Sequence, residues 1–167
     1  MTLPSSTIET AAKHILGLQD PQAWTDWATQ ALVEGFDSPS LRILAGLTPP
    51  FDWPEIERLS SKALAGLKVT ALTEEQALNV WVACLLKQML AGQLDRFSAL
   101  EKLKELHLIR HYEPRLRDFY LLFYALEELN NGSDQWYWDG ANPDNIDRII
   151  DDYAKVWLSK SATDTLS

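Results

Sequence analysis

The stretch TEEQALNVWVACLLKQMLAG, residues 73–92, determines the fold class that the sequence predicts. Thr73 and Gln76 have the spacing of a capping box, in which each side chain hydrogen-bonds the backbone N–H of the other residue. Gly92 follows the apolar run, at a place where glycine commonly ends a helix. Between these signals, apolar side chains would occupy nearly every side of a helix, which is typical of a buried one. We therefore expect a helix over residues 74–91 at the centre of the core, with Trp81 buried.

The rest of the chain carries similar helix-start signals. Residues that commonly cap helices stand at six further expected starts: Ser6, Asp20, Ser38, Asp52, Asp95 and Asn142. Three of them directly precede a proline, which suits the first position of a helix. The predicted helices cover residues 6–17, 21–34, 39–45, 53–66, 74–91, 95–110, 114–130 and 143–159. We expect the helix over residues 114–130 to share the centre with the helix over residues 74–91.

The fold class follows from these segments. No segment shows the sustained alternation of apolar and polar residues that a half-buried strand requires. A length of 167 residues is that of about one domain. We predict an all-α protein in which residues 1–167 form a single domain, a compact orthogonal bundle of about seven or eight helices.

Composition points to a cytoplasmic protein. Hydrophobic residues make up 46% of the chain, and no apolar run reaches the ~20 residues that a membrane-spanning helix needs. The first ten residues, MTLPSSTIET, lack the basic and apolar regions of a signal peptide. Cys84 is the single cysteine and lies in an apolar run, so we expect a reduced thiol in the core.

Negative charge is concentrated near the C-terminus. The net charge is −9, and residues 127–152 contain eight acidic residues against one basic residue, Arg148. Such a surface disfavours nucleic acid and anionic membranes as partners and allows a basic protein. Helical spacing predicts that Asp151 pairs with Lys155 within this segment.

The string GFDSPSLRILAGL, residues 35–47, predicts a helix that ends at Gly35 and another that begins after Ser38. It resembles a pattern found in a family of bacterial proteins of unknown function. In that family a helix that contains tryptophan also precedes this pattern. Here the predicted helix before residue 35 contains Trp24 and Trp27. The resemblance implies a bacterial, cytosolic origin and no particular chemistry.

His107 and His111 form the one candidate metal pair. They lie four positions apart, so a continuous helix would place both imidazoles on one face, as some zinc sites do. The glutamate of the metalloprotease motif is absent after the first histidine. The alternative is that both rings favour the negative end of a helix dipole. A small metal-binding protein or enzyme would use this pair with nearby Glu113 or Asp118.

Other catalytic patterns are missing from the sequence. It contains no glycine-rich phosphate loop, no G-x-S-x-G elbow and no C-x-x-C motif. We therefore expect no cofactor and favour a function other than catalysis.

Three adjacent aromatic residues lie between the last two predicted helices. Trp136, Tyr137 and Trp138 stand between Asp134 and Asp139. In an extended segment both tryptophans would share one face and the tyrosine would take the other. The rings either plug one end of the bundle or form a binding anchor, and both roles are compatible. The favoured hypothesis is an interaction protein whose acidic, aromatic surface engages a basic partner, in a toxin-neutralising or regulatory role.

Overall fold

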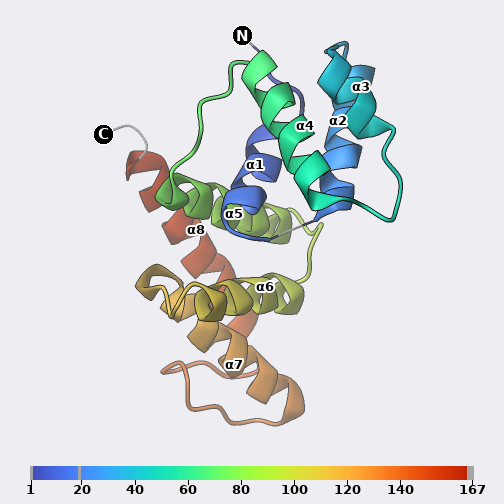
Figure 1. The fold of residues 1–167 in the computed structure, drawn as a ribbon. Coiled ribbons are helices and arrows are strands. Elements are labelled where there is room, and N and C mark those ends of the chain that lie inside the picture. The colour runs from blue at the N-terminus through green and yellow to red at the C-terminus, as the bar shows by residue number, and fades with distance from the viewer. Residues whose placement is uncertain (1, 19, 165–167) are drawn as a thin grey trace. The chain divides into compact units, whose positions relative to one another are not determined.

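The computed structural model describes residues 2–18 and 20–164, and this part of the chain is all-α. Figure 1 shows its helices, and no strand occurs among the described residues. The predicted fold class is therefore confirmed. The helices are α1 (Thr7–Ile15), α2 (Pro21–Val33), α3 (Pro39–Ala45), α4 (Trp53–Gly66), α5 (Glu74–Leu90), α6 (Arg96–Ile109), a 3-10 turn η1 (Pro114–Leu116), α7 (Arg117–Asn131) and α8 (Ile146–Asp164).

The chain forms two compact units, Met1–Trp81 and Val82–Ser167, and the boundary falls within α5. That the two units form a single domain stays a prediction. None of the helices in the described part of the chain combines the length and the apolar character that a membrane span requires.

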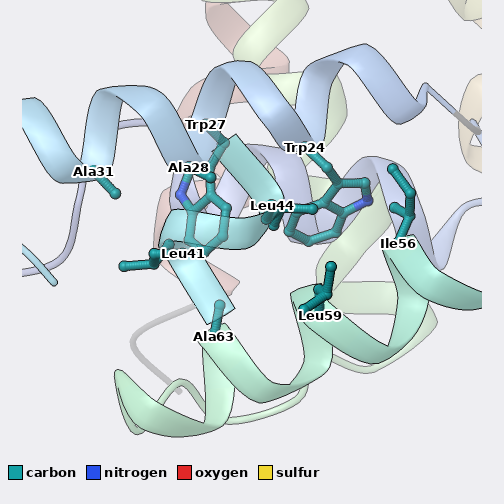
Figure 2. Packing of buried hydrophobic residues seen from close by; sticks show 9 residues of the cluster. All are labelled: Trp24, Trp27, Ala28, Ala31, Leu41, Leu44, Ile56, Leu59 and Ala63. Carbon is teal, nitrogen blue, oxygen red and sulfur yellow. The ribbon is translucent and has the colours of Figure 1, made fainter. Parts of the chain in front are cut away.

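The core of the first unit lies among α2, α3 and α4. Figure 2 shows the indole rings of Trp24 and Trp27 pointing from α2 toward side chains of the other two helices. The two rings meet edge to face, with centroids 5.4 Å apart. Trp27 Nε1 donates a hydrogen bond of 2.9 Å to Thr7 Oγ1, so its buried N–H is satisfied. The buried cluster consists of Trp24, Trp27, Ala28, Ala31, Leu41, Leu44, Ile56, Leu59 and Ala63.

Helix α5 is buried on nearly all sides, as its sequence predicts. From Ala77 to Leu90 only Lys87 is exposed. Trp81 is 8% exposed, which confirms its predicted burial. The capping box is also confirmed, since Thr73 N–H donates to Gln76 Oε1 at 2.9 Å and Gln76 N–H donates to Thr73 Oγ1 at 3.1 Å.

Most of the predicted helix starts are correct, and two predicted caps are wrong. The side chains of Asp20, Ser38 and Asp95 each accept a backbone hydrogen bond from the first turn. Ser6 instead has a left-handed backbone with φ 62° and makes no side-chain cap. Asp52 likewise makes none. A turn precedes α1 at this point, in which the N–H and the Oγ1 of Thr7 both donate to the carbonyl of Pro4, at 3.3 and 2.6 Å.

The second unit contains the rest of α5 with α6, η1, α7 and α8. Helix α7 contributes the buried aromatic side chains of Phe119 and Phe123 to this unit. The predicted helix over residues 114–130 is divided into η1 and α7, and the predicted helix over residues 143–159 begins only at Ile146. Residues 143–145 form a turn, because Asn142 Oδ1 accepts hydrogen bonds from the N–H groups of Asp144 and Asn145.

Candidate functional site

A loop between α7 and α8, residues 132–145, contains the three adjacent aromatic residues and is called the aromatic loop below. The side chain of Gln135 holds its first half. Gln135 Oε1 accepts hydrogen bonds from the N–H groups of Tyr137 and Trp138, both at 2.8 Å. Gln135 Nε2 donates to the carbonyls of Trp138 and Ala141, at 2.5 and 3.1 Å. One amide therefore fixes four backbone groups of the loop.

The side chain of Asn145 holds the second half of the aromatic loop. Asn145 Oδ1 accepts from Asn142 N–H at 2.8 Å, and Asn145 Nδ2 donates to the carbonyl of Gly140 at 2.9 Å. Gly140 has φ +80°, a left-handed conformation that glycine adopts without steric penalty. These bonds join the end of the loop to the turn that precedes α8.

The three aromatic side chains have different surroundings. Tyr137 stacks on Tyr124 of α7, with centroids 5.3 Å apart and planes 29° apart. Trp138 is half-buried and meets Tyr153 of α8 edge to face at 5.7 Å. Trp136 is 89% exposed. The expectation that both tryptophans share one face of an extended segment is therefore wrong, because the Gln135 hydrogen bonds curl the backbone between them.

The three aromatic side chains therefore differ in their packing. Tyr137 and Trp138 contact the helices. Trp136 contributes its backbone N–H to this structure, through a hydrogen bond of 3.2 Å to Glu128 Oε2. The Trp136 side chain is exposed to solvent.

Acidic side chains surround the exposed tryptophan in sequence. Asp134 and Asp139, which flank the three aromatic residues, are both exposed. Asp151 is engaged elsewhere, since its carboxylate accepts two hydrogen bonds from Arg96 of α6, at 3.0 and 2.8 Å. The predicted pairing of Asp151 with Lys155 is therefore wrong. Helical spacing could not reveal Arg96, which lies 55 residues away.

Ring contacts continue from the aromatic loop along one side of α7. Tyr124 meets Tyr120 at 5.0 Å, and Tyr120 meets His107 of α6 at 5.2 Å. His107 in turn meets Tyr112 at 5.6 Å. The tyrosines at helical spacing on α7 are partly buried in this succession.

The structure separates the two candidate metal-binding histidines. Helix α6 ends at Ile109, and His111 lies beyond it with φ 56°, so the continuous helix that the pair requires does not form. His107 is 4% exposed, and its Nδ1 lies 2.8 Å from the carbonyl oxygen of Glu113. Within the described residues, no group of three or more histidine, cysteine or acidic side chains is placed to hold a metal ion.

The two carboxylates near His107 have other partners. Glu113 Oε1 accepts from Arg115 Nε at 2.9 Å, and this hydrogen bond is the main cause that lowers the pKa of Glu113. Asp118 Oδ2 accepts from the hydroxyl of Tyr153 at 2.8 Å. Neither Glu113 nor Asp118 forms a side-chain hydrogen bond to the imidazole of His107. No contact among these side chains therefore supports the predicted metal or catalytic site.

His107 instead lines an open pocket that the sequence gives no means of recognising. The other lining residues are Tyr112, Pro114, Arg117 and Tyr120, and the set of five is called the tyrosine pocket below. The second unit therefore presents an exposed tryptophan among acidic residues and a separate pocket that contains an arginine. Comparison of the chain with protein-family models, curated proteins and solved structures found no match.

Proposed function

We propose that the protein is an interaction module whose aromatic loop docks a basic partner protein, with Trp136 as the anchor. The observation that carries this proposal is an indole ring that is 89% exposed on a loop fixed by side-chain hydrogen bonds. A loop whose backbone is already fixed loses little conformational freedom on binding. Tryptophan is also among the residues that most often dominate the energy of a protein interface.

The charge of the surrounding segment supports a basic partner. Residues 127–152 carry eight acidic residues and one basic residue, and Asp134 and Asp139 flank the anchor. Complementary charge raises the rate of association and discriminates against acidic surfaces. The same charge disfavours docking of the exposed ring into an anionic membrane or against nucleic acid.

The proposed setting is the bacterial cytosol, in a toxin-neutralising or regulatory role. The setting rests on the resemblance of residues 35–47 to bacterial sequences. The role rests on the acidic surface, because a protein that neutralises a basic toxin or a nucleic-acid-binding regulator needs such a surface.

Site-specific photo-crosslinking tests this function directly. A photo-reactive phenylalanine analogue replaces Trp136, and the protein is irradiated in bacterial cells that carry the native gene. The matched control places the same analogue at Val156, which is 52% exposed on α8. The proposal predicts one dominant crosslinked protein of basic isoelectric point from position 136 and not from position 156. The absence of a crosslink, or the same crosslinked proteins from both positions, would refute the proposal.

A further inference from the structure

We infer that the tyrosine pocket binds a small aromatic carboxylate, independently of the aromatic loop. The pocket has a volume of about 310 Å³ and is open to solvent. This volume is at the lower end of the range of ligand pockets, which suits a ligand with a single ring. Two tyrosines, a histidine and an arginine line it, and each supplies a different interaction with such a ligand.

The imidazole of His107 is fixed and has one nitrogen left for a ligand. The Glu113 carbonyl can only accept, so His107 Nδ1 carries a hydrogen and donates to it across 2.8 Å. In the neutral ring Nε2 is then an acceptor. No described protein group hydrogen-bonds Nε2, and it is not among the enclosed polar atoms that lack a partner. It therefore reaches solvent through the pocket and can accept a hydrogen bond from a ligand hydroxyl.

Arg117 supplies the positive charge. Within the described part of the chain its guanidinium forms no ion pair, although two carboxylates lie close to it in sequence. Glu113 pairs with Arg115, and Asp118 accepts the hydroxyl of Tyr153. Arg117 is exposed and starts α7, where the helix dipole also favours an anion. A carboxylate can pair with the guanidinium through two parallel hydrogen bonds.

The two tyrosines supply the surfaces for a planar ring. Tyr112 and Tyr120 each contact the imidazole of His107, with ring centroids 5.6 and 5.2 Å from its centroid. Tyr112 is 69% exposed although it is a large aromatic residue. Its backbone, with φ 60°, and that of His111, with φ 56°, are both left-handed, and Tyr112 N–H donates to the carbonyl of His107 at 2.8 Å. Consecutive non-glycine residues with positive φ are strained, and such strain is concentrated at functional sites.

Calorimetric titration with 4-hydroxybenzoate tests this inference. Its carboxylate would pair with Arg117, and its ring would pack on the two tyrosines. Its hydroxyl would donate a hydrogen bond to His107 Nε2. The expected dissociation constant is about 1 mM or tighter, given the small number of atoms that make contact. Two comparison compounds each lack one feature: 4-hydroxybenzamide has no charge, and 4-hydroxycyclohexanecarboxylate has no aromatic ring. Each is expected to bind about tenfold more weakly or worse.

Variants of the full chain locate the binding site. Arg117→Gln and Tyr112→Asn should each weaken 4-hydroxybenzoate at least about tenfold, and asparagine keeps the left-handed backbone at position 112 accessible. The control Lys102→Gln removes the same charge from an exposed position of α6 outside the pocket, and it should bind as the wild type does. Failure of the wild type to bind at about 10 mM would overturn the inference, since that is tenfold above the expected constant. Equal weakening by Lys102→Gln, or equal binding of 4-hydroxycyclohexanecarboxylate, would overturn it as well.

Discussion

The ring of Tyr137 lies stacked on the ring of Tyr124, with centroids 5.3 Å apart and planes 29° apart. This contact joins the aromatic loop to α7, and the contact between Trp138 and Tyr153 joins it to α8. The loop therefore has a structural side and an open side. Trp136 occupies the open side, so variants on the two sides should differ in their effect on stability.

Truncation of the two tryptophans should affect stability very differently. Trp138→Ala removes a half-buried ring and its edge-to-face contact, which should lower the free energy of unfolding by about 1–3 kcal/mol. Trp136→Ala removes a ring that is 89% exposed, so unfolding should change by no more than about 0.5 kcal/mol. Urea denaturation measures both values. Equal losses in the two variants would show that Trp136 also packs on the protein.

Gln135→Ala should release the aromatic loop. The variant loses the four hydrogen bonds that one side chain makes to the loop backbone. We expect a loss of about 1–2 kcal/mol in the free energy of unfolding, since the exposed backbone groups regain water. The amide hydrogens of Tyr137 and Trp138 should exchange faster with solvent, as measured by nuclear magnetic resonance. Gln93→Ala, at an exposed position after α5, is the control, and equal exchange in both variants would contradict the proposed role of Gln135.

Trp81→Ala should be among the most destabilising single changes in the chain. Trp81 is 8% exposed, and Lys13 Nζ lies 5.0 Å from the centre of its ring. Truncation of a buried tryptophan to alanine should lower the free energy of unfolding by roughly 3–5 kcal/mol. Val33→Ala, at a side chain that is 76% exposed, is the comparison. A melting temperature that falls equally little in both variants would show that α5 is not part of a packed core.

Tyr153 should give the protein a stability that depends on alkaline pH. Burial raises the pKa of Tyr153 above its ordinary value of 10.0, and the hydrogen bond to Asp118 adds to this effect. Because the pKa is higher in the folded state, Tyr153 contributes fully to the free energy of unfolding below the pKa of the unfolded chain. This contribution is lost as pH rises above the pKa of the unfolded chain. Unfolding free energy should therefore fall above pH 10, and less steeply in Tyr153→Phe. Tyr112→Phe, at a side chain that is 69% exposed, should keep the wild-type slope. Parallel slopes in wild type and Tyr153→Phe would exclude this linkage.

The helices could be predicted from the sequence wherever one residue determines one local hydrogen bond. Asp20, Ser38 and Asp95 cap helices in the structure because their short side chains reach an N–H in the first turn. The same pattern failed at Ser6, where the preceding turn places the backbone at φ 62°. The capping pattern considers only residues from Ser6 onward. It therefore could not predict a backbone conformation that the preceding residues set.

The candidate site was only partly predictable for a related reason. Sequence spacing identified Trp136 and its acidic neighbours but could not assign the exposed and packed faces, since Gln135 curls the loop. The tyrosine pocket depends on the left-handed backbone of His111 and Tyr112, which ends α6 and separates His111 from His107. The prediction from sequence spacing assumed a helix that continues through His111, and it therefore placed the two histidines on one face.

Comparative capture from a cytosolic extract tests most directly the claim that Trp136 anchors a basic partner. Immobilised wild type, Trp136→Ala and Asp134→Asn/Asp139→Asn are exposed to the same extract, and the bound proteins are quantified. A basic protein should be retained by the wild type. Loss of an interface anchor should weaken its binding about 30-fold in Trp136→Ala. The double variant should slow its association, an effect that salt should reproduce in the wild type. The claim would be contradicted if wild type and Trp136→Ala recovered the same proteins in equal amounts. It would also be contradicted if the wild type recovered no protein.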